Sequence, residues 1–131
     1  MSIDTIGNFL TIIRNGIMAS KLTVEAPYSK FKEELCKLLK EEGFIRDFSL
    51  SGDKPAIKKI KVFLKYVDGE SVVHEITRVS TPGCRCYRNS TSLKPVIGGL
   101  GISIVSTNKG IMTDKTAKKL SIGGEVVCTV W

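Results

Sequence analysis

The apolar residues of this chain change their spacing along its length, and this change limits the folds open to it. Near the N-terminus they recur every three or four residues, at Ile3, Ile6, Leu10, Ile13 and Ile17. That spacing indicates an amphipathic helix, and Gly16 is expected near its end. In residues 58–67, KKIKVFLKYV, apolar residues alternate with lysines. This is the period of a strand with one buried face.

The rest of the first half predicts an α-β-α-β-β order. Residues 22–26 alternate as a short strand ended by Pro27, and Ser29 is expected to cap a second helix that stops before Gly43. The core face of that helix is expected to hold Phe31, Leu35, Leu38 and Leu39. Residues 44–50 and 58–67 follow as strands. Residues 1–68 are therefore expected to form an N-terminal module of two helices on a three-stranded sheet.

The character of the chain changes at Asp68-Gly69, a pair typical of tight turns. Strand-like segments follow at 71–80, 84–88 and 102–107. A short helix capped by Thr113 or Asp114 then precedes a last strand at 125–131. Residues 69–131 are expected to form a second, mostly antiparallel β module with a short helix, so the predicted fold class is α+β.

The net charge of +7 lies mainly in the second half of the chain. Residues 1–70 hold 12 basic and 10 acidic side chains, whereas residues 71–131 hold 8 and 3. This asymmetry favours a polyanionic partner such as nucleic acid, although a basic protein without such a partner fits equally well. No apolar window of about 18 residues exists, and Asp4 and Arg14 argue against a signal peptide, so neither a membrane partner nor export is expected.

The residue types needed for catalysis or metal binding are sparse. The four cysteines form no Cys-x-x-Cys pair, and Cys84 and Cys86 would share one strand face, so buried reduced thiols and no metal are expected. The single histidine, His74, lies in a strand-like segment. The glycines of 98–101 match no phosphate-binding motif and predict a loop. We therefore expect no enzymatic activity, no cofactor and no small-molecule substrate.

Groups that contact nucleic-acid backbones are more frequent, in residues 77–80, 85–92 and 106–109. Tyr87 could stack on an unpaired base, or it could be a sheet-face tyrosine beside solvated arginines. Ser106, Thr107 and Asn108 are short groups that donate and accept hydrogen bonds, which suits an RNA minor groove. They could equally well cap a turn and the helix after it, and the residues alone favour neither interpretation.

Several segments resemble one known family. The segment IVSTNKGIMTDKTAKK, followed by IGGEVVCTVW, resembles the C-terminal signature of the family of the eighth protein of the small ribosomal subunit, of bacterial type. The segments DTIGNFLTIIRNG, KLLKEEGFIRDF, RVSTPGCRCYRN and LKPVIGGLGI are similar to further landmarks of that family in the same order. The resemblance extends over essentially the whole chain. Asn108 stands where serine is common, and Thr81 where arginine is common.

The resemblance implies a structural, non-enzymatic constituent of the small ribosomal subunit, located on cytoplasmic or organellar ribosomes of bacterial type. Such proteins bind the central domain of the small-subunit ribosomal RNA directly and help to organise it during 30S assembly. Their partners include neighbouring ribosomal proteins and, in some bacteria, the messenger RNA of their own operon, whose translation they repress. A free-standing RNA-binding regulator is the main alternative from another class.

The resemblance and the residue types together predict two sets of RNA contacts. The principal set is Ser106, Thr107, Asn108, Lys109, Tyr87, Arg88, Gly123, Gly124 and Glu125. The secondary set is Arg14, Asn15, Lys30, Lys32, Arg85 and Lys94. Within the principal set, Glu125 is expected to orient the loop rather than to touch a phosphate, because a carboxylate and a phosphate repel each other.

Overall fold

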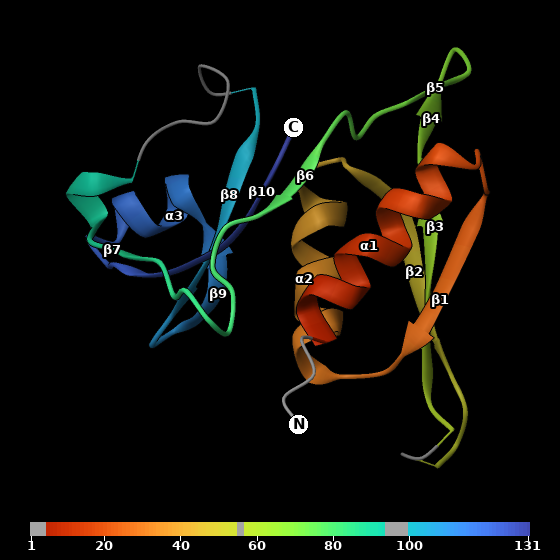
Figure 1. Ribbon diagram of the computed structural model, residues 1–131, viewed down its shortest axis with the longest axis horizontal. Helices are drawn as coiled ribbons and strands as arrows, with labels where there is room; N and C mark the ends of the chain where they lie inside the picture. Colours follow the sequence, from red (N-terminus) through yellow and green to blue (C-terminus); the bar gives the residue numbers. More distant parts are fainter. Residues whose placement is uncertain (1–4, 55–56, 94–99) are drawn as a thin grey trace. The chain divides into compact units, whose positions relative to one another are not determined.

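A computed structural model describes residues 5–54, 57–93 and 100–131 (Figure 1). The chain divides into two compact units. One unit holds Asn8–Val73, and the other holds His74–Trp131 together with residues 5–7. No helix in the described ranges is long and apolar enough to cross a membrane.

The first unit contains helix α1 (Thr5–Met18) from Asn8 onward and helix α2 (Lys30–Glu41). It also contains the strands β1 (Thr23–Pro27), β2 (Ile45–Ser51) and β3 (Lys59–Leu64). The strands form an antiparallel sheet in the order β1-β3-β2, and both helices lie on one face of it (Figure 1). The predicted α-β-α-β-β order is confirmed. Ile60, Val62 and Leu64 alternate inward from β3, as the period of two required.

Helix α1 ends at Met18, so Gly16 lies in its last turn, and the expected position near the helix end is confirmed. A Cβ atom at Gly16 would lie 2.4 Å from Cγ1 of Val24 on β1. The glycine is therefore required by the close approach of helix and strand. The neighbouring strand begins at Thr23 rather than at the predicted residue 22, and Leu22 is 77% exposed.

Helix α2 begins and ends as predicted. The Ser29 hydroxyl accepts a hydrogen bond from Lys32 N at 3.2 Å, and Gly43 follows the helix with φ of +81°. The buried face includes Leu35 and Leu39 but also Cys36 and Lys32, which the apolar pattern did not reveal. In β2, a bulge between Ile45 and Asp47 shifts the pairing with β3, and Arg46 and Asp47 are both exposed.

The strand predicted over 58–67 is divided in two. β3 ends at Leu64, and β4 (Tyr66–Val67) pairs with β5 (Glu70–Ser71) in a separate hairpin. Asp68 and Gly69 form its turn with φ of 53° and 79°, which confirms the turn prediction.

The second unit contains β6 (Ile76–Arg78), β7 (Tyr87–Arg88), the short helix η1 (Ser90–Ser92), β8 (Ile102–Thr107), β9 (Gly110–Thr113), α3 (Asp114–Lys119) and β10 (Gly124–Val130). The antiparallel sheet has the order β6-β10-β8-β9, and β7 also pairs with β10. Helix α3 is capped by Thr113, and its Ala117 packs in a cluster with Leu93, Val105, Met112 and Val126. The predicted β-rich module with a short helix is thus observed, and the α+β class is confirmed.

Two predicted strands of this unit are much shorter than expected. Only Ile76–Arg78 of the segment 71–80 and Tyr87–Arg88 of the segment 84–88 pair in the sheet. Thr81 and Cys84 close a turn through two backbone hydrogen bonds of 3.1 Å, which takes Cys84 out of the strand. Cys84 is therefore exposed, contrary to the expectation of buried thiols, and it does not share a strand face with Cys86. Residues 98 and 99 of the loop predicted at 98–101 lie outside the described residues.

The other two cysteines are buried as expected. Burial raises the pKa of the Cys36 and Cys128 thiols to about 12, so both stay protonated at neutral pH. The described part of the chain contains no group of three or more histidine, cysteine or acidic side chains that could hold a metal ion.

All three helices end in the same backbone motif, but only α2 has glycine in its left-handed position. After α3, Ile122 N donates to Ala117 O at 2.9 Å, and Ser121 adopts φ of 56°. After α1, Lys21 N donates to Gly16 O at 2.9 Å, and Ser20 adopts φ of 54°. A side chain in this conformation costs about 1 kcal/mol relative to glycine, so both helix ends hold local strain.

We expect Ser121→Gly to raise the free energy of unfolding by about 1 kcal/mol, because glycine adopts a positive φ without a steric cost. Urea denaturation measures the effect. The matched control is Ser92→Gly, in an exposed position of the same unit without a positive φ, which should lower stability by about 0.5–1 kcal/mol. Destabilisation by both changes would contradict the presence of strain at Ser121.

Candidate RNA-binding site

Three strands of the second unit bring the principal predicted residues together. Tyr87 on β7 lies opposite Glu125 on β10, and Glu125 lies opposite Ser106 on β8. One residue further toward the strand ends, Arg88 lies opposite Gly124. We refer to Tyr87, Glu125 and Ser106 as the transverse row. Residues from three distant parts of the sequence thus form one surface at the end of the sheet.

Gly123 and Gly124 allow the three backbones to come this close. A Cβ atom at Gly124 would lie 2.2 Å from Ser106 O, and one at Gly123 would lie 2.6 Å from Arg88 O. Both contacts are shorter than any side chain tolerates, and the neighbours are backbone atoms that cannot rotate away. The two glycines are therefore required by the approach of β7 and β8 to β10, rather than by an unusual φ.

Glu125 is held from both sides within the transverse row. Its Oε2 atom accepts hydrogen bonds from Ser80 Oγ at 2.5 Å and from Arg85 Nη1 at 3.1 Å. Ser80 is 1% exposed, and its hydroxyl in turn accepts from Cys86 N at 3.1 Å. The Ser80 hydrogen bond, with the nearby Arg85 charge, holds the pKa of Glu125 below its usual value despite partial burial. An ionised carboxylate therefore ties residues 80–86 to β10.

The turn between β8 and β9 gives its polar residues different surroundings. Thr107 Oγ1 donates to Gly110 O at 2.7 Å and accepts from Lys109 N at 3.1 Å, so this hydroxyl stabilises the turn. Among the described residues, neither the Ser106 hydroxyl nor the Asn108 amide makes a hydrogen bond. Asn108 and Lys109 are exposed. Turn capping therefore accounts for Thr107 but leaves the polar groups of Ser106 and Asn108 available.

The aromatic and basic members of the site lie on β7 and just before it, across β10 from β8. Tyr87 is 65% exposed, which excludes a core position for its ring. Arg88 Nη1 donates to Tyr87 O at 3.1 Å, while Arg85 pairs with Glu125 and keeps half of its side chain exposed. The ring and the two guanidinium groups are thus presented on the surface around the transverse row.

The secondary residues of the first unit do not share one environment. Arg14, Asn15 and Lys30 are exposed, whereas Lys32 is only 7% exposed. Lys32 Nζ donates to Pro27 O at 2.8 Å and lies 5.8 Å from the centre of the Phe9 ring, and burial lowers its pKa. The Lys32 ammonium therefore has its hydrogen-bond partner within the first unit. Lys94 lies outside the described residues.

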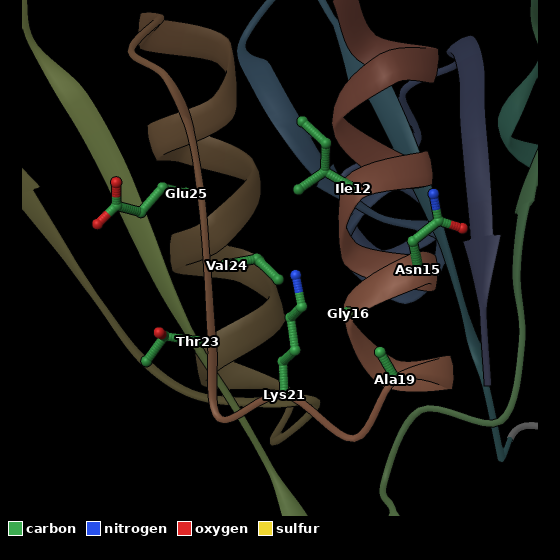
Figure 2. A pocket seen from close by; sticks show the side chains of 8 residues that line it. All are labelled: Ile12, Asn15, Gly16, Ala19, Lys21, Thr23, Val24 and Glu25. Carbon is green, nitrogen blue, oxygen red and sulfur yellow. The ribbon is translucent and has the colours of Figure 1, made fainter.

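Asn15 also lines a pocket of about 570 Å³ between α1 and β1. Figure 2 shows the Lys21 side chain extending between the two elements, with Asn15 and Ala19 on the helix. Glu25 and Thr23 come from the strand side of the pocket. The pocket mixes one ammonium with one carboxylate, so its charge favours no particular ligand.

Ser80, among the described residues around Glu125, has a role that the sequence did not indicate. It belongs to the polar segment 77–80, but nothing local marks it as the buried anchor of Glu125. The two residues are 45 positions apart, and only the pairing of strands joins them. No sequence pattern of period two or 3.6 could have revealed this contact.

Comparison with known proteins finds relatives that match nearly the whole chain. The family model described as Ribosomal protein S8 matches residues 4–131. The small ribosomal subunit protein uS8 of Pseudomonas aeruginosa (strain UCBPP-PA14) is 48% identical over 129 residues, covering 98% of this chain and 97% of the relative. That of Buchnera aphidicola subsp. Acyrthosiphon pisum (strain 5A) is 47% identical over 127 residues, covering 97% and 96%.

These similarities define the class of the protein as ribosomal, structural and non-enzymatic. The chain belongs to the ribosomal protein S8 family. The resemblance of its segments to that family is confirmed, and so is the expectation that the protein is not an enzyme.

We expect Gly124→Ala to force β8 away from β10, because the new methyl group would overlap Ser106 O. Overpacking of this kind costs about 1–3 kcal/mol, and urea denaturation measures it. The control is Gly83→Ala in the same unit, where an added Cβ meets no atom within 4 Å and should change stability by less than about 0.5 kcal/mol. Equal denaturation midpoints for the two variants would contradict the role of Gly124.

Proposed function

We propose that this protein is a structural component of the small ribosomal subunit that binds the central domain of its ribosomal RNA directly. Binding through the surface around the transverse row would help to organise this RNA during 30S assembly, next to neighbouring ribosomal proteins. The observation that carries the proposal is the alignment of Tyr87, Glu125 and Ser106 beside a turn with available polar groups. The bacterial relatives named for the small subunit support a cytoplasmic ribosome as its location.

Two kinds of group on this surface contact the RNA: neutral groups that form hydrogen bonds, and groups that contact phosphates or stack on bases. The Ser106 hydroxyl and the Asn108 amide can donate and accept hydrogen bonds, as the 2′-hydroxyls and base edges of an RNA minor groove require. Lys109 supplies a phosphate contact, and the exposed Tyr87 ring can stack on an unpaired base. Asn108, where serine is common, retains this capacity because an amide both donates and accepts.

The remaining principal residues act by holding this surface in shape. Thr107 closes the turn, Gly123 and Gly124 admit the neighbouring backbones, and Glu125 fixes residues 80–86. Arg85 and Arg88 add positive charge at the margin. A rigid surface loses little entropy on binding, so it selects RNA by shape more than by charge.

Secondary contacts are proposed for Arg14, Asn15 and Lys30, which are exposed on the first unit. Lys32 is not included, because its ammonium donates to Pro27 O. Lys94 remains a proposed secondary contact on the basis of the sequence alone.

Recognition by shape also supports a second target, since a messenger RNA of the protein's own operon that presents the same shape would bind the same residues.

Hydroxyl-radical footprinting on small-subunit ribosomal RNA tests the proposal directly. We expect the purified protein to protect one helix of the central domain, and to sediment with 30S particles at moderate salt. A free-standing regulator would leave 30S particles under the same conditions. Protection spread evenly over the RNA would show non-specific binding and would reject the proposal.

Ser106→Ala should weaken binding to the central-domain RNA by about 1–3 kcal/mol, because it leaves polar partners on the RNA unpaired. The thermal stability of the Ser106→Ala variant should equal that of the wild type, since the Ser106 hydroxyl makes no hydrogen bond among the described residues. Thr107→Ala should weaken binding to a similar extent and also loosen the turn, whereas Thr107→Ser should keep both properties. Filter binding and thermal denaturation separate these effects. Unchanged affinity in both alanine variants would exclude this turn as the main contact.

Lys109→Ala should change the salt dependence of binding instead. Loss of one phosphate contact lowers the slope of log affinity against log salt concentration by about 0.9. Filter binding at several salt concentrations measures the slope, with Ser106→Ala as the control that keeps the wild-type value. A wild-type slope for Lys109→Ala would mean that this ammonium does not contact a phosphate.

A further inference from the structure

Helices α1 and α2 lie on one face of the three-stranded sheet of the first unit (Figure 1). Val62 and Leu64 of β3 point toward the helices and are buried. Because successive residues of a strand point to opposite faces, Lys61 and Phe63 lie on the other face, which we call the outer face. Phe63 is half-buried there. The outer face therefore presents part of an aromatic ring from the central strand of the sheet.

The bulge in β2 brings two charged side chains to Phe63. Ile45 pairs with Leu64 and Asp47 pairs with Phe63, so Arg46 is the extra residue of the bulge. Arg46, Asp47 and Phe63 together line a pocket of about 260 Å³, which we call the outer pocket. Its lining residues supply an aromatic ring, a guanidinium group and a carboxylate.

The Asp47 carboxylate is fixed in place and ionised. Its Oδ1 atom accepts hydrogen bonds from Phe48 N at 2.8 Å and from Lys40 Nζ at 3.1 Å. The Phe48 hydrogen bond, together with the Lys40 ammonium, holds the pKa of Asp47 below its usual value. A carboxylate offers about four acceptor positions, so this one can also accept hydrogen bonds from the N–H groups of a ligand.

The charges around the Phe63 ring are of both signs. Lys61 Nζ lies 5.5 Å from the centre of the ring, and Arg46 lines the pocket beside it. Glu25 on β1 pairs with Lys61, as Asp47 pairs with Phe63. A surface of mixed charge does not favour a bare phosphate backbone. It fits a ligand that combines an aromatic ring, a phosphate and an edge with N–H groups, and a nucleotide has all three.

We propose that the outer pocket binds an unpaired guanine base of RNA. The base stacks on the Phe63 ring, and its N1–H and N2–H groups donate to the Asp47 carboxylate. Arg46 and Lys61 contact the adjoining phosphates. The inference goes beyond the proposed function, because it concerns the other unit, an unstacked base, and residues outside both sets of expected RNA contacts.

Titration of the isotope-labelled full chain with short single-stranded RNAs tests the inference by NMR. The probes are the tetranucleotides r(UGUU), r(UAUU) and r(UUUU), which carry the same number of phosphates. We expect r(UGUU) to shift the backbone amide signals of residues 46–48 and 61–63 and to bind most tightly. Adenine stacks as well as guanine but presents an acceptor at N1, so r(UAUU) should bind more weakly.

Four variants separate stacking from hydrogen bonding. Phe63→Leu should weaken r(UGUU) binding by about tenfold, whereas Phe63→Tyr, which keeps the ring, should bind as the wild type does. Phe31→Leu removes another half-buried ring, on α2, and is the matched control that should also keep the wild-type affinity. Asp47→Ala should abolish the preference for guanine, so that r(UGUU) and r(UAUU) bind equally.

Each contrary result overturns the inference. Wild-type binding of r(UGUU) no tighter than that of r(UAUU) or r(UUUU) would exclude recognition of guanine, and unchanged signals at residues 46–48 and 61–63 would exclude the outer pocket. Unchanged r(UGUU) binding by Phe63→Leu would exclude stacking on this ring, and a guanine preference that survives in Asp47→Ala would exclude the carboxylate. All of these results leave the proposed function intact, because footprinting on the central-domain RNA tests it separately.

Discussion

The close approach of three backbones at Gly123-Gly124 is the constraint on which the rest of the site depends. With Ser106 O on one side and Arg88 O on the other, there is no room for a side chain at either glycine. Because β7 and β8 can both come up to β10 here, Tyr87, Glu125 and Ser106 lie opposite one another. A wider spacing would lose this alignment while the sheet further along β10 could still form. The geometry of the surface is thus set by backbone contact rather than by the side chains that it displays.

The proposed RNA-binding surface around the transverse row also has to be rigid in the free protein. The buried Ser80 hydroxyl connects Glu125 to the backbone of Cys86, so residues 80–86 are held from beneath. Thr107 bonds within its own turn for the same purpose. Groups with internal partners hold the shape, whereas Ser106 and Asn108, which make no hydrogen bond among the described residues, are the groups proposed to contact RNA. This separation reduces the entropy lost on binding, because few rotamers remain to be ordered.

Local patterns predicted most of the elements but few of the contacts between them. Ser29, Gly43 and Asp68-Gly69 mark their helix and turn boundaries by conformational preferences that act within a few residues, and these predictions held. The close approach of Gly16 to Val24 was not indicated by any local pattern, because Val24 lies on another element. Lys32 was expected on the surface, but its stem packs in the core and its ammonium reaches a backbone carbonyl. Cys84 lies outside its predicted strand because its backbone N–H and C=O groups are hydrogen-bonded to Thr81 across a turn.

The sequence by itself determined the α+β class, the order of the elements and the polar character of residues 106–109, since periodicity and turn preference depend on neighbours in the chain. Its segments were also specific enough to indicate the ribosomal protein S8 family. Only the tertiary structure decided that Thr107 closes the turn while Ser106 stays available, and that Ser80 anchors Glu125. The Ser80–Glu125 contact depends on strand register between segments 45 residues apart, whereas the Thr107 contacts lie within one turn and depend on the conformation of that turn. Register arises from the packing of whole elements, and no local pattern contains it.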